Sequence, residues 1–298
     1  MALLDRAIVK VLPAVPRPLV QRLSSRYIAG ASLGDAMRVV RRLNAEGKLA
    51  TIDVLGEEIA REDEAAAIAR AYHDALERID DEGLDSNISV KLSGLGLELE
   101  RGVCRANLEA VVRNARERGS FVRIDMEDSS TTDATLAVYR ELRSAGYTNL
   151  GVVLQSRLRR TLGDVAGLED VRLCKGIYLE PPAIAFQDAD VIRSSFVRSL
   201  EALLDQGSYV AVATHDELLI GKALELIAAH GLGRDEYEFQ MLLGVRPERG
   251  DELVRAGHRL RIYVPFGTQW YEYSLRRLQE NPKIAGYVAA DTLRRLRP

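Results

Sequence analysis

Short apolar runs alternate with longer amphipathic stretches through most of this sequence, and few folds accommodate that order. Eight runs are rich in β-branched residues, as strands are, and cover residues 49–57, 87–96, 121–127, 150–156, 171–178, 209–216, 237–244 and 258–267. Between them, apolar residues recur at helical spacing over residues 60–80, 105–118, 132–145, 188–206 and 217–230. Eight strands that alternate with helices over about 240 residues predict an α/β fold, a closed (β/α)8 TIM-like barrel. An open doubly wound sheet is the alternative.

The barrel is predicted to occupy residues 49–298 as one domain, after an N-terminal helical extension over residues 1–48. No linker rich in Gly and Ser divides the chain, and residues 32–48 carry a helical pattern of their own. The first residues are apolar, but charged residues and prolines interrupt them, which makes a poor signal peptide. Whether their apolar face packs on the barrel or lies on a membrane surface stays open.

Composition excludes several classes of function. The net charge is −3, so no basic excess is present to neutralise phosphates, and nucleic-acid binding is not expected. The two cysteines, Cys104 and Cys174, are too few for a disulfide framework or a thiolate zinc site, and we expect reduced thiols in a cytoplasmic protein. No metal-binding His pair, phosphate loop, dinucleotide fingerprint or nucleophile elbow occurs, so no metal is expected.

Polar side chains gather at the ends of the predicted strands, where a barrel of this kind places its active site. They are Lys91, Asp125, Glu127, Asp128, Gln155, Ser156, Arg157, Arg172, Lys175, Tyr178, Thr214, His215, Asp216, Gln240 and Tyr263. Structural roles are the alternative for each of them. Lys91 and Asp125 could form only an ion pair at the rim, Asp125 could pair with Arg123 or Arg172, and His215 could be a core histidine.

A basic pair lies beyond the last strand. Tyr273, Arg276 and Arg277 are spaced to share one helical face, and two adjacent guanidiniums suit a carboxylate ligand. A solvated basic face is the structural alternative.

Four segments together resemble the proline dehydrogenase family. They are VRLCKGIY (171–178), VATHD (212–216), YEFQMLLG (237–244) and RIYVPFGTQWYEYSLRRLQENP (261–282). The resemblance runs from about Thr51 to Pro282 and includes all eight predicted strands in order, which makes it specific. It implies an FAD-dependent enzyme of the monofunctional bacterial form, which oxidises L-proline to Δ1-pyrroline-5-carboxylate by hydride transfer to flavin N5 and passes the electrons to a quinone.

The same resemblance implies roles for individual residues. Arg276 and Arg277 would bind the proline carboxylate with help from Lys91, and Asp125 would lie beneath the site. Tyr263 and Tyr273 would flank the proline ring, and a tyrosine at 263 disfavours hydroxyproline. Glu57 would act as a gate that pairs with Arg276. The residues implied in cofactor binding are Gln155, Arg172, Cys174, Lys175, Gly176, Tyr178, Thr214, His215, Gln240 and Glu280.

This sequence departs from the family pattern at Arg157, Ile177, Asp216 and Leu243, none of which belongs to the implied substrate site. Two rival functions stay open: a cofactor-free barrel lyase that uses Lys91 or Lys175 as a Schiff base, and a non-catalytic barrel that binds carboxylates. Homo-oligomerisation and peripheral contact with the inner face of the cell membrane stay open as well.

Overall fold

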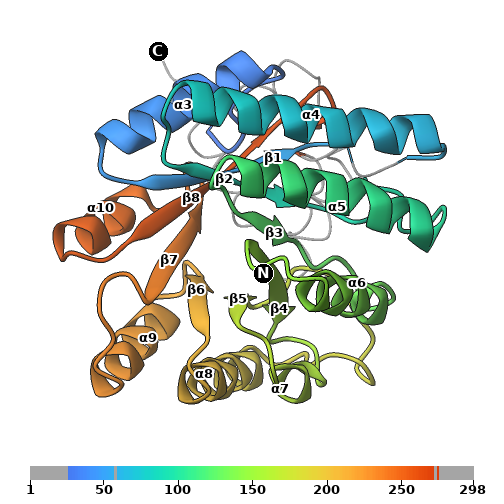
Figure 1. Ribbon diagram of the computed structural model, residues 1–298. Coiled ribbons are helices and arrows are strands. Elements are labelled where there is room, and N and C mark those ends of the chain that lie inside the picture. Colours follow the sequence, from blue (N-terminus) through green and yellow to red (C-terminus); the bar gives the residue numbers. More distant parts are fainter. Residues whose placement is uncertain (1–25, 57–58, 272–273, 275–298) are drawn as a thin grey trace, which may run out of the picture.

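The computed structural model describes residues 26–56, 59–271 and 274, and within them it confirms the predicted closed barrel. Eight strands follow one another round the barrel in chain order, and β8 closes it by pairing in parallel with β1 (Figure 1). The strands are β1 (Leu49–Val54), β2 (Ser86–Val90), β3 (Val122–Ile124), β4 (Leu150–Gln155), β5 (Asp170–Cys174), β6 (Tyr209–Ala213), β7 (Tyr237–Leu242) and β8 (Leu260–Phe266). Closure excludes the open sheet.

Helices surround the strands (Figure 1). They are α3 (Leu33–Ala45), α4 (Glu62–Asp81), α5 (Arg101–Glu117), α6 (Thr132–Ser144), α7 (Thr161–Asp164), α8 (Ala189–Asp205), α9 (Glu217–Ala229) and α10 (Pro247–Arg255). α10 is not among the predicted helices, because Pro247 and Gly250 interrupt its pattern. Proline is tolerated there because it occupies the first turn, where its missing N–H has no intrahelical partner.

Helix α3 precedes β1 in the chain but packs against both β8 and β1, between the last strand and the first. Ser32 begins it with a capping box: its side chain accepts a hydrogen bond from the Asp35 backbone, and the Asp35 carboxylate accepts one from the Ser32 backbone. Met37 and Val40 are fully buried against the strands. Residues 26–48, which include this helix, are the described part of the predicted extension, and residues 1–25 lie outside the described residues.

Several strands end earlier than predicted. β2 ends at Val90 rather than at residue 96, and β6 ends at Ala213 rather than at residue 216. After β2 the apolar pattern continues because Leu92 and Leu95 are fully buried without pairing in the sheet. The polar residues of the predicted strand ends therefore lie partly in loops at the carboxyl end of the barrel.

The two faces of the strands differ in character. Outward residues such as Ile52, Ile88 and Val152 are buried beneath the helices. Because side chains alternate along a strand, their neighbours point into the barrel. These neighbours include Asp53 and Ser89, both fully buried. The apolar core thus lies between strands and helices, and the barrel interior is polar.

Candidate functional site at the carboxyl end of the barrel

A buried ion pair joins the first two strands. Lys91, directly after β2, donates from Nζ to Oδ2 of Asp53 on β1 at 2.7 Å. Asp53 has no solvent exposure, and the Tyr72 hydroxyl of α4 lies 3.4 Å from its other oxygen. The structural alternative paired Lys91 with Asp125, but among the described residues the structure gives Lys91 an ion pair with Asp53 and none with Asp125. Asp53 was missed in the sequence, although a carboxylate in the buried run LATIDV is a signal that could have found it.

Asp125, directly after β3, is the centre of the cluster. Its Oδ1 accepts from the Ser89 hydroxyl at 2.6 Å and from Nη1 of Arg172, and its Oδ2 accepts from the Tyr263 hydroxyl at 2.7 Å. Burial opposes the charged form of Asp125, but the Arg172 guanidinium, the Lys91 ammonium and these hydrogen bonds outweigh burial and hold its pKa below the usual value. Asp125 is therefore a carboxylate at neutral pH.

Arg123 does not pair with Asp125. Its guanidinium binds the side chain and backbone carbonyl of Asp170, the first residue of β5, at the amino end of the barrel. Of the two arginines named as possible partners of Asp125, Arg172 is the one that binds it. The two arginines differ by their place along the strands: Arg123 precedes Asp125 by two residues, so its side chain lies nearer to the start of the barrel.

Arg172 on β5 is held on two sides. Its Nε donates to the side-chain oxygen of Gln240 at 2.5 Å, its Nη1 binds Asp125 and Ser89, and its Cζ lies 5.4 Å from the centre of the Tyr263 ring. Its Nη2 is buried and has no hydrogen-bond partner within the part of the chain that the structure describes. A buried donor without a partner is costly, so Nη2 is suited to a ligand acceptor.

Gln155, the last residue of β4, lies against Gly176 in the loop after β5. Its side-chain nitrogen donates to the Glu127 carbonyl at 2.7 Å. Gly176 has φ +91°, and a Cβ there would lie 2.7 Å from the side-chain oxygen of Gln155. Backbone and amide thus approach more closely than any other residue would permit at position 176.

Charged residues surround the ends of β5 and β6. Lys175 binds Oδ2 of Asp216 at 3.1 Å, and Arg193 of α8 binds the same oxygen at 2.8 Å. Asp216 also caps α9, since its Oδ1 accepts from the Leu218 backbone. Burial alone would raise the pKa of Asp216, but the hydrogen bonds and charges of the two cations outweigh burial and hold the pKa below its usual value. Asp216 is therefore ionised.

The remaining predicted residues of this rim have structural contacts. Thr214 accepts from the Asp216 backbone at 3.1 Å, and Nε2 of His215 accepts from the Leu242 backbone at 3.0 Å. Arg157, unexplained by the family pattern, donates to the Tyr178 carbonyl at 3.1 Å and so fixes the loop that follows β5. Cys174, the last residue of that strand, is half-buried. Ile177 is 41% exposed, so its bulk lies at the surface of this loop.

Five predicted site residues lie outside the described residues: Glu57, Tyr273, Arg276, Arg277 and Glu280. Among the described residues, no group of three His, Cys, Asp or Glu side chains could hold a metal ion. In the same residues, no helix is both long and apolar enough to cross a membrane.

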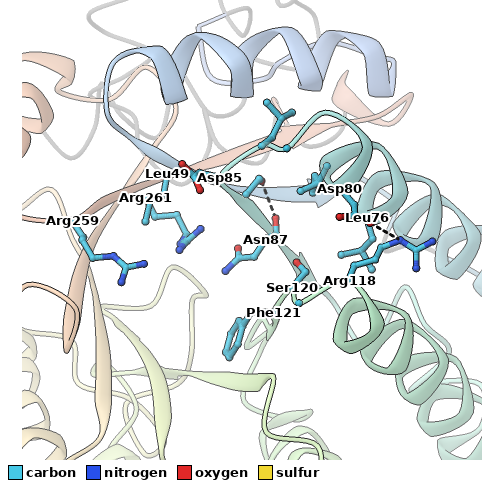
Figure 2. Close-up of a pocket in the computed structure, with 15 residues that line it drawn as sticks. Leu49, Leu76, Asp80, Asp85, Asn87, Arg118, Ser120, Phe121, Arg259 and Arg261 are labelled. Atoms are coloured by element: carbon cyan, nitrogen blue, oxygen red, sulfur yellow. Dashed lines mark hydrogen bonds and ion pairs between the residues drawn. The ribbon is translucent and has the colours of Figure 1, made fainter.

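A hollow of about 320 Å³ lies at the opposite, amino end of the barrel (Figure 2). Arg118, Arg259 and Arg261 line it together with Asp80 and Asp85. Its arginines bind carboxylates, Arg118 to Asp80, Arg259 to Asp235 and Arg261 to Glu238. More polar groups converge at the carboxyl end, where barrels of this kind place their active sites, so that end is the better candidate for the site.

Comparison with known proteins agrees with the resemblance. The sequence model of the family described as "Proline dehydrogenase" matches residues 36–290. Proline dehydrogenase 1 of Bacillus subtilis subsp. natto is 39% identical over 274 residues, which cover 91% of this chain and 90% of that protein. The proline dehydrogenase of Deinococcus radiodurans is 35% identical over 300 residues, which cover 95% of this chain and 97% of that protein.

Solved structures share the barrel. The crystal structure of proline utilization A from Bdellovibrio bacteriovorus, inactivated by N-propargylglycine, matches with a TM-score of 0.83 and 22% identity. The match covers 91% of this chain and 36% of that one, so this chain spans about a third of the larger protein. Proline utilization A from Corynebacterium freiburgense matches with a TM-score of 0.76 and 19% identity, over 96% of this chain and 34% of that one. At these identities the likeness shows the fold alone.

Proposed function

The chain belongs to the proline dehydrogenase family, and we propose that it oxidises L-proline to Δ1-pyrroline-5-carboxylate with FAD at the carboxyl end of the barrel. Membership implies a flavin cofactor and the first step of proline breakdown. The observation that carries the proposal is the largely buried cluster of Lys91, Asp125, Arg172, Gln240 and Tyr263, since its polar groups converge from five strands where barrel enzymes do their chemistry.

On the substrate side, Lys91 supplies an ammonium for the proline carboxylate. Asp53 keeps that ammonium oriented, and the Tyr263 hydroxyl lies 3.5 Å from it. Asp125 in turn accepts from Tyr263, so the tyrosine ring is fixed at the wall of the site. We propose that Arg276 and Arg277 complete the carboxylate site, as the family resemblance implies.

On the cofactor side, the donor set fits a flavin. The buried Nη2 of Arg172 lacks a partner among the described residues, and the isoalloxazine ring is rich in acceptors. Gln155 and Gly176 would hold the ring edge, and Lys175, Thr214 and His215 the ribityl and pyrophosphate groups. When bound, FAD supplies the hydride acceptor at N5. The Arg172 cation would stabilise the negative charge that reduction adds nearby.

The ion pair of Lys91 speaks against the Schiff-base lyase. A lysine attacks a carbonyl as the neutral amine, whereas Lys91 donates a hydrogen bond to a carboxylate with no solvent exposure, an arrangement that favours the ammonium. Lys175 is similarly bound to Asp216.

We further propose that the electrons pass to a quinone, and that the protein is cytoplasmic with peripheral contact to the inner face of the membrane.

The experiment that tests the proposal is an anaerobic titration of the purified protein with L-proline, followed by visible absorption. We expect a flavin spectrum that bleaches on addition of proline, with one equivalent of pyrroline-5-carboxylate per flavin. A flavin spectrum that proline leaves unchanged would reject proline as the substrate. A colourless protein that takes up no added FAD would reject the flavin and restore the lyase.

A further inference from the structure

The side-chain amide of Gln240 lies between Arg172 and Glu238 and binds both of them. The Gln240 nitrogen donates to Oε1 of Glu238, and the Gln240 oxygen accepts from Nε of Arg172 at 2.5 Å. Ala211 of β6 lies between Arg172 and Glu238 in the sheet register, and its small side chain leaves room for this chain of contacts inside the barrel. All four residues are buried.

The chemistry of the two outer groups fixes the direction of the chain. A guanidinium can only donate hydrogen bonds, and an ionised carboxylate can only accept them. The Gln240 amide must therefore turn its nitrogen to Glu238 and its oxygen to Arg172. If residue 238 could not accept, the amide could turn over and present a donor to the Nε donor of Arg172.

Glu238 is itself firmly held and charged. Arg261 donates from Nε to both of its oxygens, at 2.8 and 3.1 Å, and Nη1 of Arg261 donates to the Ala50 carbonyl of β1 at 2.7 Å. The Tyr209 hydroxyl donates to Oε2 at 3.1 Å. Burial raises the pKa of Glu238, but the Arg261 charge and the hydrogen bonds from Arg261 and Gln240 outweigh it and lower the pKa to about 2. The carboxylate therefore stays ionised over the working pH range.

We propose that Glu238 is a positioning residue for the redox cofactor: it sets the Gln240 amide, which holds Arg172 so that Nη2 faces the flavin. The inference rests on the proposed function. A cation held in place stabilises the reduced flavin more than one that can move away, because its orientation needs no rearrangement when the charge develops. Glu238 thus raises the reduction potential of the flavin without touching it.

Substitution of Glu238 by Asp tests this at constant charge. Aspartate is one methylene shorter, so its carboxylate cannot reach both Arg261 and Gln240 in the same way. We expect the binding of reduced relative to oxidised flavin to weaken about tenfold, which lowers the potential by about 30 mV for a two-electron couple. Dithionite titration against a reference dye measures this without proline turnover.

Gln240→Met removes the link and leaves the Glu238–Arg261 pair intact, so it tests the inference even where Glu238→Asp folds poorly. It should lower the potential as well. If Glu238 acts through Gln240, the double variant should show the shift of Gln240→Met alone. A double-variant shift equal to the sum of the two single shifts would overturn the inference.

Tyr209→Phe is the matched control, because it removes a hydrogen bond from the other oxygen of the same carboxylate. Tyr209→Phe should lower the melting temperature and leave the flavin potential unchanged. If Glu238 had only a structural role, Glu238→Asp would give the same result as this control. If the flavin potential of Glu238→Asp equals that of the wild type, the role of Glu238 is overturned and the proposed function is not. If wild-type protein binds flavin but proline does not reduce that flavin, only the proposed function is rejected. If the protein binds no flavin, the proposed function and the role of Glu238 are both rejected.

Discussion

Substitution of Asp125 by Asn removes the negative charge at the centre of the cluster and keeps the size of the side chain. The amide oxygen can still accept from Ser89 and Arg172, but the amide nitrogen cannot accept the proton of the Tyr263 hydroxyl. Arg172, which is 6% exposed, loses its counter-ion without gaining water. Asp125→Asn therefore removes the Tyr263 contact and leaves a buried cation without its countercharge.

The magnitude follows from the burial of the pair. Removal of one partner of a buried ion pair costs about 3–5 kcal/mol, and we expect the lower end because Asn keeps one acceptor. A loss of about 3 kcal/mol corresponds to a fall in melting temperature of about 5 °C for a protein of this size. Ser89→Ala is the milder control, since it removes one hydrogen bond and keeps the charge, and should cost about 1–2 kcal/mol.

The pH dependence of the melting temperature, measured by calorimetry at equal FAD excess, tests the cause. The pKa of Asp125 is lower in the folded protein than the ordinary 3.8, so its contribution is complete above that value and is lost as pH falls through the folded pKa. The gap between wild type and Asp125→Asn should be widest near neutral pH and narrow below about pH 4. Equal melting temperatures at pH 7, or a gap that does not change with pH, would refute the reasoning.

Three further substitutions or probes test other contacts. Gly176→Ala places a Cβ 2.7 Å from the Gln155 oxygen at φ +91°, which should destabilise the fold by about 1–2 kcal/mol. It should also weaken FAD binding about tenfold in a fluorescence titration. Unchanged affinity would show that the close contact between Gly176 and Gln155 is unimportant for the cofactor. Asp216→Asn releases Lys175 from its carboxylate, so FAD affinity should rise a few-fold at low salt, and a fall would show that Lys175 does not face the pyrophosphate. Burial and the Glu127 charge raise the pKa of Cys104 to about 12, so a thiol reagent at pH 8 should leave Cys104 unmodified until the protein unfolds, as peptide mass spectrometry would reveal.

The barrel could be predicted because its signal is local and repeated. Each strand is a β-branched run and each helix an amphipathic stretch, and the parallel order follows from their alternation. The strand ends were harder, since Leu92 and Leu95 are as apolar as strand residues but are buried in a loop. α10 was hidden by its proline and glycine, whose effect depends on their position within the helix.

Contacts inside the barrel could be predicted only in part. Convergence of Asp125, Arg172 and Tyr263 could be predicted, because a closed barrel of parallel strands brings polar side chains of all its strands to one interior. The partner of Asp125 could not be predicted, because the sequence pattern places both Arg123 and Arg172 on strands of the barrel interior. Only the register of the sheet shows that Arg123 lies beside Asp170. Neither the Asp53 partner of Lys91 nor the Glu238 partner of Gln240 was predicted. Lys91 and Asp53 come from neighbouring strands, and Glu238 and Gln240 lie two residues apart on β7, where their shared inward face does not by itself show that they bind each other.

The location of the flavin is the central claim, and a crystal structure of the protein with FAD bound tests it most directly. The isoalloxazine ring should lie at the carboxyl end of the barrel, with an acceptor atom within hydrogen-bond distance of Nη2 of Arg172 and the pyrophosphate near Lys175. A flavin bound in the hollow lined by Arg118 and Arg259, or anywhere without contact to Arg172, would contradict the account.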